Sequence, residues 1–411
     1  MNNNLRTAAL IAAGIVSAGS VARAEEAAKT NPVETALTST TISGYVSTSA
    51  LFNLGESDGG VVLPGRVFDP ASKVNQINLD VVSLAIEKPL DESDWAAGYK
   101  AELLFGQDAN LIGTTSALAY GGAADNDFAI KQAYVTLKAP VGNDLIAKIG
   151  VFDAIIGYEV FDSIKNPNYS RSYAYYIEPF QHTGLLLSYQ LTDWLSVNAG
   201  IADTWDSPIN APGIDSGARK DFGLQTYMGS MAITIPKGSG FLEGMNIYGG
   251  VVHGLSSATG GGVPGGDGDP RTSVYGGLTI PTPIDPLKVG LAYDYRFVER
   301  YRAGQDNAAE YATTMAGYVT YALSKQLNLG VRGEYATGSA GSWGAKPVGG
   351  PNNEEFFGLT TTLDYNLWAN VLTRFEFRWD TDLSDGPSSF GSVNKPDDNA
   401  YIIGLNVAYK F

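Results

Sequence analysis

Cysteine is absent from the chain of 411 residues, histidine occurs only twice, and charged residues make up only 17% of it. Without cysteine no disulfide can form, so another feature of the fold has to stabilise the protein. After the N-terminal segment, no apolar run approaches the roughly 18 residues that a membrane-spanning helix requires. Basic residues are also few, 27 against 43 acidic ones, which disfavours nucleic acid or anionic surfaces as partners. These absences exclude a bundle of membrane helices and a fold held together by disulfides.

Glycine and tyrosine are abundant, with 49 and 23 residues. A disordered chain would lack the aromatic and aliphatic content seen here. Glycine fits the tight turns and the crowded inward-facing positions of an all-β protein, and short alternating runs of apolar residues accompany it. The composition therefore favours an all-β fold.

The first 24 residues have the three parts of a secretory signal peptide. A short polar region with Arg6 precedes the apolar stretch from Ala8 to Ala18, and the small-residue motif Ala22-Arg23-Ala24 follows. The apolar stretch is too short for a membrane-spanning helix. Cleavage after residue 24 would remove two arginines and no acids, so the basic residues would fall from 27 to 25 and the net charge from -16 to -18. The sequence predicts an exported, acidic protein.

The last run of the chain alternates without interruption between apolar residues and smaller or polar ones. Its apolar face consists of Tyr401, Ile403, Leu405, Val407, Tyr409 and Phe411. Ten steps of about 3.3 Å, tilted by roughly 40°, span about 25 Å along a membrane normal, which is the height of the lipid-facing band of a transmembrane barrel. A half-buried strand of a soluble sheet alternates in the same way, but here an aromatic residue borders each end of the stripe. We therefore expect lipid to cover it.

From Thr40 onward the chain divides into similar runs, joined alternately by short turns and long polar connections. About sixteen strands are predicted, over residues 41–53, 74–88, 95–105, 128–138, 144–152, 183–191, 194–203, 220–235, 244–254, 272–280, 287–298, 310–323, 327–338, 355–365, 368–380 and 400–411. An even number of strands returns both termini to the periplasmic side. The sequence therefore predicts an all-β transmembrane antiparallel barrel over residues 40–411, with short periplasmic turns, long extracellular loops and a periplasmic tail over residues 25–39.

Charged residues alternate with the apolar ones in several of these runs and would face the lumen. The candidate lumen-lining residues are Lys100, Glu102, Lys288, Asp294, Arg296, Arg332, Glu334, Arg374, Glu376 and Arg378. The lumen of a barrel this wide holds water, so such groups would present a potential to passing ions. They could equally brace the wall by pairing with one another, and the sequence leaves both roles open.

One connection, from Asp153 to His182, is dense in tyrosine and in charges of both signs, whereas other long connections are dense in glycine and serine. The motifs GYEV (157–160), NPNYSRSY (166–173) and EPFQHTG (178–184), with the preceding strand IKQAYVTL and the terminal YKF, resemble the β-barrel porin-2 (OmpL-like) family. The resemblance is specific over residues 128–206 and collinear from Thr41 to Phe411. It implies a channel in a bacterial outer membrane and no particular solute.

This connection could fold into the lumen and narrow it, with charges of both signs sorting solutes by size and charge. The candidate constriction residues are Glu159, Asp162, Lys165, Arg171, Glu178 and His182. Alternatively, Tyr173, Tyr175 and Tyr176 pack the connection onto the rim of the barrel and the charges pair with one another. A change of ion selectivity on replacing Arg171 by Glu would favour the first interpretation.

The sequence contains no pattern typical of a catalytic or cofactor site. His182 and His253 lie in different predicted hairpins, and the segment GLSSATG after His253 resembles a nucleophile motif only loosely. Asp267 and Asp269 fall short of the six or more oxygens that calcium takes, which favours a solvated turn. Phosphate-binding and dinucleotide-binding motifs are absent. No enzyme activity, cofactor or metal is therefore predicted.

Together these features predict an outer-membrane porin, a passive diffusion channel for small hydrophilic solutes or ions. The alternatives are an outer-membrane barrel hydrolase and a structural or adhesive barrel with a plugged lumen. Expected partners are outer-membrane lipid, small hydrophilic solutes and the barrel assembly machinery, which would read Tyr409 and Phe411 at the C-terminus. A homotrimer is expected only by analogy with other sixteen-stranded porins.

Overall fold

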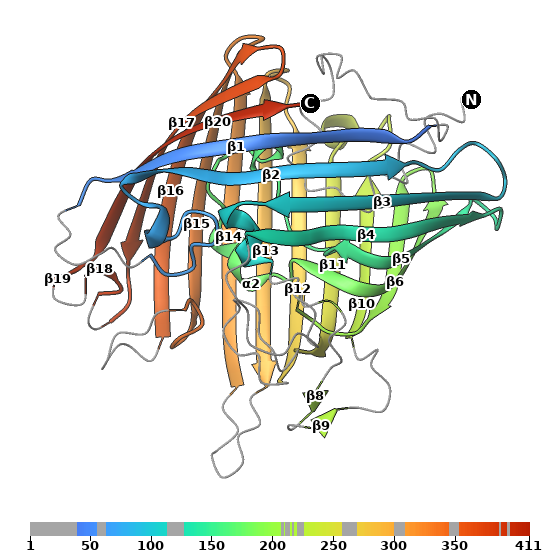
Figure 1. The fold of residues 1–411 in the computed structure, drawn as a ribbon, viewed down its shortest axis with the longest axis horizontal. Helices are drawn as coiled ribbons and strands as arrows, with labels where there is room; N and C mark the ends of the chain where they lie inside the picture. The colour runs from blue at the N-terminus through green and yellow to red at the C-terminus, as the bar shows by residue number, and fades with distance from the viewer. Residues whose placement is uncertain are drawn as a thin grey trace.

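Sixteen antiparallel strands form a closed barrel in the computed structural model of the chain (Figure 1). The structure describes residues 39–55, 63–112, 127–206, 209, 214–215, 218–219, 226–256, 269–299, 309–344, 353–385, 388–392 and 395–411. In order around the barrel the strands are β1 (Thr41–Asn53), β2 (Gln76–Lys88), β3 (Ala96–Phe105), β4 (Phe128–Ala139), β5 (Leu145–Asp153), β6 (Gln181–Thr192), β7 (Leu195–Ala202), β10 (Thr226–Thr234), β11 (Asn246–Leu255), β12 (Pro270–Pro281), β13 (Leu287–Glu299), β14 (Ala309–Ala322), β15 (Leu327–Ser339), β16 (Asn353–Trp368), β17 (Val371–Asp382) and β20 (Asn399–Lys410). β20 pairs with β1 and closes the ring. The predicted fold class is confirmed.

Each of the sixteen predicted spans overlaps one barrel strand, and the first has the bounds of β1. The largest difference concerns β10, which begins at Thr226 instead of residue 220; residues 220–225 lie outside the described ranges. Two further hairpins lie in long connections, β8 (Ile214–Asp215) with β9 (Ala218–Arg219) and β18 (Phe390–Ser392) with β19 (Lys395–Asp397). The sequence does not predict them, because strands of two or three residues are too short to show an alternating pattern.

The outer surface of the barrel is apolar because side chains along each strand alternate between its two faces. In β20, Leu405 and Val407 are exposed, whereas Asn406 and Ala408 are buried. The exposed side chains include the aromatic residues Phe52, Trp95, Trp194, Tyr227 and Trp368. Soluble proteins rarely expose an apolar surface of this extent, so lipid is the surrounding that fits it.

None of the helices in the described ranges is both long enough and apolar enough to cross a membrane.

The last residue, Phe411, takes part in the closure of the barrel. Its backbone exchanges two hydrogen bonds with Gly44 of β1, each 3.0 Å long. A Cβ atom at Gly44 would overlap the Phe411 ring, so the absence of a side chain there makes room for the ring. The aromatic end of the chain is therefore held against β1.

Connections between strands occupy part of the barrel interior. The short helices η2 (Ala71–Lys73), η3 (Gln107–Leu111), η4 (Ser163–Lys165) and α2 (Tyr173–Ile177) belong to these connections, and Figure 1 shows α2 within the ring of strands. Buried residues of the connections pack against the wall; Phe68, Phe161 and Tyr175, for example, share a cluster with Tyr45 and Leu104. Another short helix, η5 (Gly240–Leu242), lies in the turn between β10 and β11. Connections between strands therefore fill part of the barrel interior.

Candidate functional site

The connection between β5 and β6, residues 154–180, crosses the lumen and reaches the opposite wall; we call it the inner loop. The backbone amides of Tyr169 and Ser170 donate to the carboxylate of Glu376 on β17, at 2.6 and 3.0 Å. The amide of Tyr173 donates to Glu334 Oε2 on β15, also at 2.6 Å. Glu376 and Glu334 are both inward-facing wall residues. The inner loop therefore lies inside the barrel.

Three arginines of the opposite wall hold the inner loop. Arg332 donates to Glu159 Oε1 and to the Ser170 carbonyl, each at 2.8 Å. Arg374 donates to two carbonyls of the inner loop at 2.7 and 2.8 Å, and Arg378 donates to a third at 2.6 Å. All three arginine side chains are buried beneath the loop. Charge-assisted hydrogen bonds of this kind are stronger than those between neutral groups, so the loop is fixed at several points.

These contacts show the surroundings of five of the candidate lumen-lining residues. The five residues Arg332, Glu334, Arg374, Glu376 and Arg378 brace the inner loop and are covered by it. The expectation that they line an open lumen therefore needs correction. The wall strands alone could not show this, because the segment that covers them comes from a distant part of the chain.

The other candidate lumen residues also face inward, in different surroundings. Lys100 pairs with Glu102 at 3.1 Å, and Arg296 donates to a carbonyl of the connection after β15 at 3.1 Å. Asp294 is buried beside the inner loop. Lys288 is partly exposed and borders a cavity near the short turns. Of this second group, Lys288 lies where a solute in the cavity could contact it.

Inward-facing glycines make room for the inner loop at three places along the wall. Gly250 of β11 faces Ile156, Gly290 of β13 faces the Tyr158 hydroxyl, and Gly330 of β15 faces the carbonyl of residue 167. A Cβ atom at any of the three would come too close to the loop for normal van der Waals contact. The glycines therefore allow the close approach of the loop to the wall that larger residues would prevent.

Most of the candidate constriction residues lie in the inner loop and are buried. Glu159, Asp162 and Glu178 are nearly inaccessible. Arg171 is buried as well; it donates to the carbonyl of residue 169 at 2.5 Å, and its guanidinium lies 4.3 Å from the centroid of the Phe68 ring. Replacing Arg171 would disturb the fold of the loop itself, so the exchange for Glu does not report on ion selectivity alone.

Lys165 and His182 differ from the other candidates. The Lys165 side chain is 48% exposed, and its Nζ lies 2.6 Å from Asp162 Oδ2. His182 belongs to β6, where its Nδ1 lies 3.3 Å from the carbonyl oxygen of residue 204 and its ring faces Phe152. His182 is therefore a buried wall residue. Of the tyrosines in the alternative interpretation, Tyr173 and Tyr175 are buried, and Tyr173 packs against Trp343 and Phe356.

A second segment, residues 63–73, also folds into the lumen, and sequence reasoning missed it. Arg66 pairs with Asp380 of β17 at 2.5 Å, and Lys73 pairs with Asp80 of β2 at 3.0 Å. The amide of residue 65 donates to the Trp343 carbonyl at 2.8 Å. The segment combines arginine, lysine and aspartate within eleven residues, and the inner loop likewise carries charges of both signs, although the segment has phenylalanine in place of tyrosine. That mixture is the signal that could have identified it.

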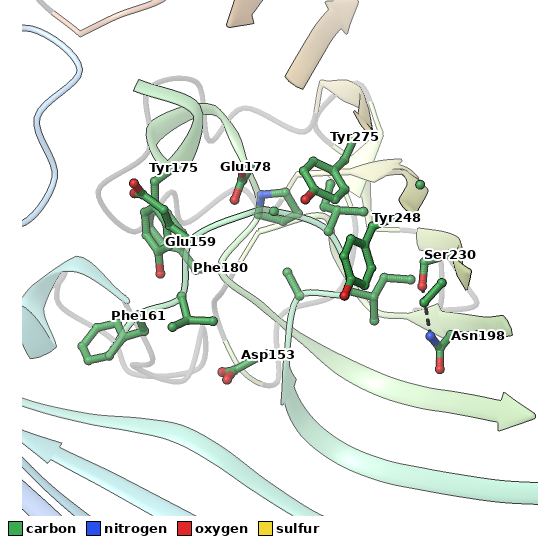
Figure 2. Close-up of a pocket in the computed structure, with 18 of the residues that line it drawn as sticks. Asp153, Glu159, Phe161, Tyr175, Glu178, Phe180, Asn198, Ser230, Tyr248 and Tyr275 are labelled. Carbon is green, nitrogen blue, oxygen red and sulfur yellow. Dashed lines mark hydrogen bonds between the residues drawn. The ribbon is translucent and has the colours of Figure 1, made fainter. Parts of the chain in front are cut away.

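A cavity remains between the inner loop and the wall formed by β7, β10, β11 and β12 (Figure 2). Its loop side includes Glu159, Phe161 and Glu178, and its wall side includes Asn198, Ser230, Tyr248 and Tyr275, with Asp153 at the start of the loop. A second cavity lies nearer the short turns, between the inner loop and β12–β16. Both contain polar side chains, so they suit water and hydrophilic solutes.

Glu178 of the inner loop packs against a second carboxyl group. It faces Asp294 of β13, and Glu159 of the same loop adds a further negative charge nearby. Burial and, next, the Asp294 carboxyl raise the pKa of Glu178 well above its usual range. The folded protein therefore favours the protonated form of Glu178.

This arrangement predicts that thermal stability falls as pH rises. A glutamate with a raised pKa in the folded state contributes its full stability below the usual glutamate pKa and loses it as pH rises through the folded-state value. Replacing Glu178 by Gln should therefore flatten this part of the dependence of melting temperature on pH. The exposed Glu243 offers a matched control, because Glu243→Gln makes the same exchange in a solvated turn. Identical pH profiles for the wild type and Glu178→Gln would contradict the prediction.

The two histidines and the acidic side chains considered for metal binding have definite places among the described residues. His253 lies on the outer face of β11, where its Nδ1 is 2.9 Å from Thr272 Oγ1, whereas the buried His182 belongs to β6. No group of three or more His, Asp or Glu side chains in the described ranges is placed to hold a metal ion. Of the two aspartates considered for calcium, Asp269 is described and buried, whereas Asp267 lies outside the described residues.

The model of the family "Putative beta-barrel porin-2, OmpL-like" matches residues 39–411 of the chain. Among curated proteins, none matches the sequence significantly.

Several solved structures of outer-membrane proteins share the fold at low sequence identity. The outer membrane channel DcaP of Acinetobacter baumannii is 12% identical, with a TM-score of 0.56 over 90% of this chain and 97% of that one. An anion-selective porin from Comamonas acidovorans is 11% identical, with a TM-score of 0.58 over 91% and 99%. The outer membrane protein OmpT of Vibrio cholerae, in a trimer form, is 13% identical, with a TM-score of 0.56 over 90% and 99%. At these identities the likeness shows the fold alone.

Proposed function

Because the chain belongs to the beta-barrel porin-2, OmpL-like, family of outer-membrane porins, we propose that it passes small hydrophilic solutes by passive diffusion and that the inner loop forms its constriction. The observation that carries this proposal is the anchoring of the inner loop across the lumen by Arg332, Arg374 and Arg378. A barrel of sixteen strands is wide enough for an aqueous channel, and a loop fixed inside it limits the size of the solutes that pass.

The route for solutes is expected to run along one side of the barrel. Residues 63–73 and their contacts with Asp80 and Asp380 occupy the side formed by β1, β2 and β17. The two cavities border β7 and β10–β16 instead. We therefore expect solutes to pass between the inner loop and this second side of the wall.

Recording from the purified protein in planar lipid bilayers tests the proposal. Discrete conductance steps are expected, and swelling of liposomes that contain the protein should be restricted to small sugars because the inner loop narrows the lumen. The two segments inside the barrel also favour a second candidate, a structural barrel with a plugged lumen. A folded protein that gives no conductance steps and no swelling would contradict the channel and support the plugged barrel.

We expect no enzyme activity, because the buried His182 and the outward-facing His253 lie apart on different wall strands. A barrel hydrolase requires a nucleophile, a base and hydrogen-bond donors around one site. Turnover of ester substrates by the purified barrel would contradict this expectation.

The protein is expected to reach the outer membrane by export and assembly. Residues 1–24 are proposed as the signal peptide and residues 25–39 as a periplasmic tail; positions 1–38 lie outside the described ranges. Outer-membrane lipid and the barrel assembly machinery are the proposed partners at this stage. A homotrimer is a further proposal, supported by the trimer form of the Vibrio cholerae protein, and light scattering of the purified complex tests it.

Deleting Phe411 is expected to reduce the amount of folded protein in the outer membrane. Both backbone hydrogen bonds to Gly44 would be lost at the point where the barrel closes, together with the aromatic end of the chain. The folded fraction can be measured by the change in gel mobility on heating. Lys410→Gln keeps the terminal aromatic residue and serves as the control, for which normal assembly is expected. Equal folded fractions in the Phe411 deletion and the control would contradict the role of the terminal residue.

A further inference from the structure

The ionisable side chains that line the cavity beside the inner loop are all acidic. They are Asp153, Glu159 and Glu178, and among the described residues no lysine or arginine side chain lines the cavity. The rest of its polar lining consists of hydroxyl and amide groups, including those of Ser230 and Asn198, which are hydrogen-bonded to each other at 3.0 Å. The ionisable lining of this cavity is therefore acidic only, whereas lysines and aspartates occur together in the lining of the second cavity.

The positive charges of the lumen offset the negative charge of this cavity only in part. Arg332, Arg374 and Arg378 are buried under the inner loop and paired with it. The cation nearest to Asp153 is Lys131, which is itself buried and whose Nζ lies 3.5 Å from Asp153 Oδ2. Lys131 also lies closer to two other carboxylates, at 3.1 and 3.4 Å, so it neutralises Asp153 only in part.

Asp153 is also the most accessible acid of the three. Its side chain is 26% exposed, whereas Glu159 and Glu178 are nearly fully buried. Glu159 in addition pairs with Arg332 at 2.8 Å. A passing ion would therefore meet the Asp153 carboxylate before any other charge of the cavity.

An independent feature of the same cavity indicates a polar occupant. Tyr275 is only 5% exposed, and its hydroxyl has no hydrogen-bond partner among the described residues. It lines the cavity from β12, and Figure 2 shows the hydroxyl directed toward the side of Glu178. A buried hydroxyl left without a partner costs about 1–3 kcal/mol, so water or a hydrophilic solute in the cavity would stabilise it. The hydroxyl oxygen also adds a neutral ligand for a cation beside the carboxylates.

We propose that this cavity is a selectivity site for small cations and that the Asp153 carboxylate is its main determinant. The proposal rests on the proposed channel function and specifies the class of ion that the channel favours. Acidic side chains along a narrow water-filled passage stabilise cations and repel anions, and the effect is strong where little bulk water screens the charge. The oxygens of Tyr275 and Ser230 complete a lining that can replace part of the hydration shell of a cation.

Reversal potentials in a potassium chloride gradient across a planar bilayer test the proposal. The wild type should favour potassium over chloride several-fold, and Asp153→Asn should bring the permeability ratio markedly closer to one while conductance steps persist. Asp193→Asn removes the same charge from an exposed turn between β6 and β7 and should leave the ratio unchanged. Tyr275→Phe should lower the preference to a smaller extent, because it removes a neutral oxygen only.

The outcomes separate this inference from the channel function itself. Conductance steps without a preference for potassium, or an Asp153→Asn channel as selective as the wild type, would overturn the cation site and leave the channel intact. A shift of equal size in Asp193→Asn would also overturn it, because the selectivity would then arise from charges outside the cavity. Absence of any conductance in the wild type would overturn the channel function as well.

Discussion

Replacing Arg332 by Gln is expected to detach the inner loop from the wall and to raise the single-channel conductance several-fold, with large current fluctuations. Arg332 is fully buried, and its guanidinium bonds to Glu159, to Glu334 and to the carbonyls of residues 170 and 171. Without it, the buried carboxylates of Glu159 and Glu334 would each lose an ion-pair partner, and breaking a buried ion pair costs about 3–5 kcal/mol. The loop can avoid that cost by leaving the wall and exposing the carboxylates to water. Bilayer recording and the melting temperature measure the two effects.

A matched control for this variant is Lys288→Gln. Lys288 also faces inward, from β13, but no hydrogen bond or ion pair joins it to the inner loop among the described residues. Its replacement changes a charge beside the solute route, but it should leave the melting temperature near that of the wild type and should not produce the large current fluctuations. If Arg332→Gln and Lys288→Gln behave alike, the arginine does not anchor the loop.

Replacing Gly330 by Ala is expected to displace the inner loop by a steric clash, whereas Arg332→Gln removes a contact that anchors the loop. A Cβ atom at Gly330 would collide with the backbone carbonyl of residue 167, which cannot move without moving the loop. Overpacking of this kind costs typically about 1–3 kcal/mol. The variant should show a lower melting temperature and a noisier channel than the wild type.

The same strand provides the control for this experiment. Gly333 also belongs to β15 but faces outward, and a Cβ atom there would meet no other atom within 4 Å. Gly333→Ala changes the backbone in the same way without touching the loop, so it should be neutral or slightly stabilising. A loss of stability as large in Gly333→Ala as in Gly330→Ala would show that the inner contact is not the cause.

Sequence reasoning left two alternatives for the position of the inner loop, because the contacts that fix the loop join residues far apart in the chain. Arg332 and Glu159 are separated by 173 positions and meet only when the barrel closes. The mixture of tyrosine and charge between residues 153 and 182 marked the connection as unusual, but it could not show which wall residues the connection contacts. The same limit applies to residues 63–73, whose partners Asp80 and Asp380 lie on β2 and β17.

The sequence by itself determined the barrel, the approximate number of its strands and the faces on which the residues of the most regular strands lie. These properties follow from a period of two residues and from the lengths of the connections, which are local and can be read along the chain. Only the tertiary structure decided that Arg332, Arg374 and Arg378 hold a loop instead of facing an open lumen. It also decided that the accessible charge of the cavity is Asp153. The physical reason is that the burial and pairing of an inward-facing charge depend on which other segments enter the barrel. The alternating pattern of a single strand gives no information about those segments.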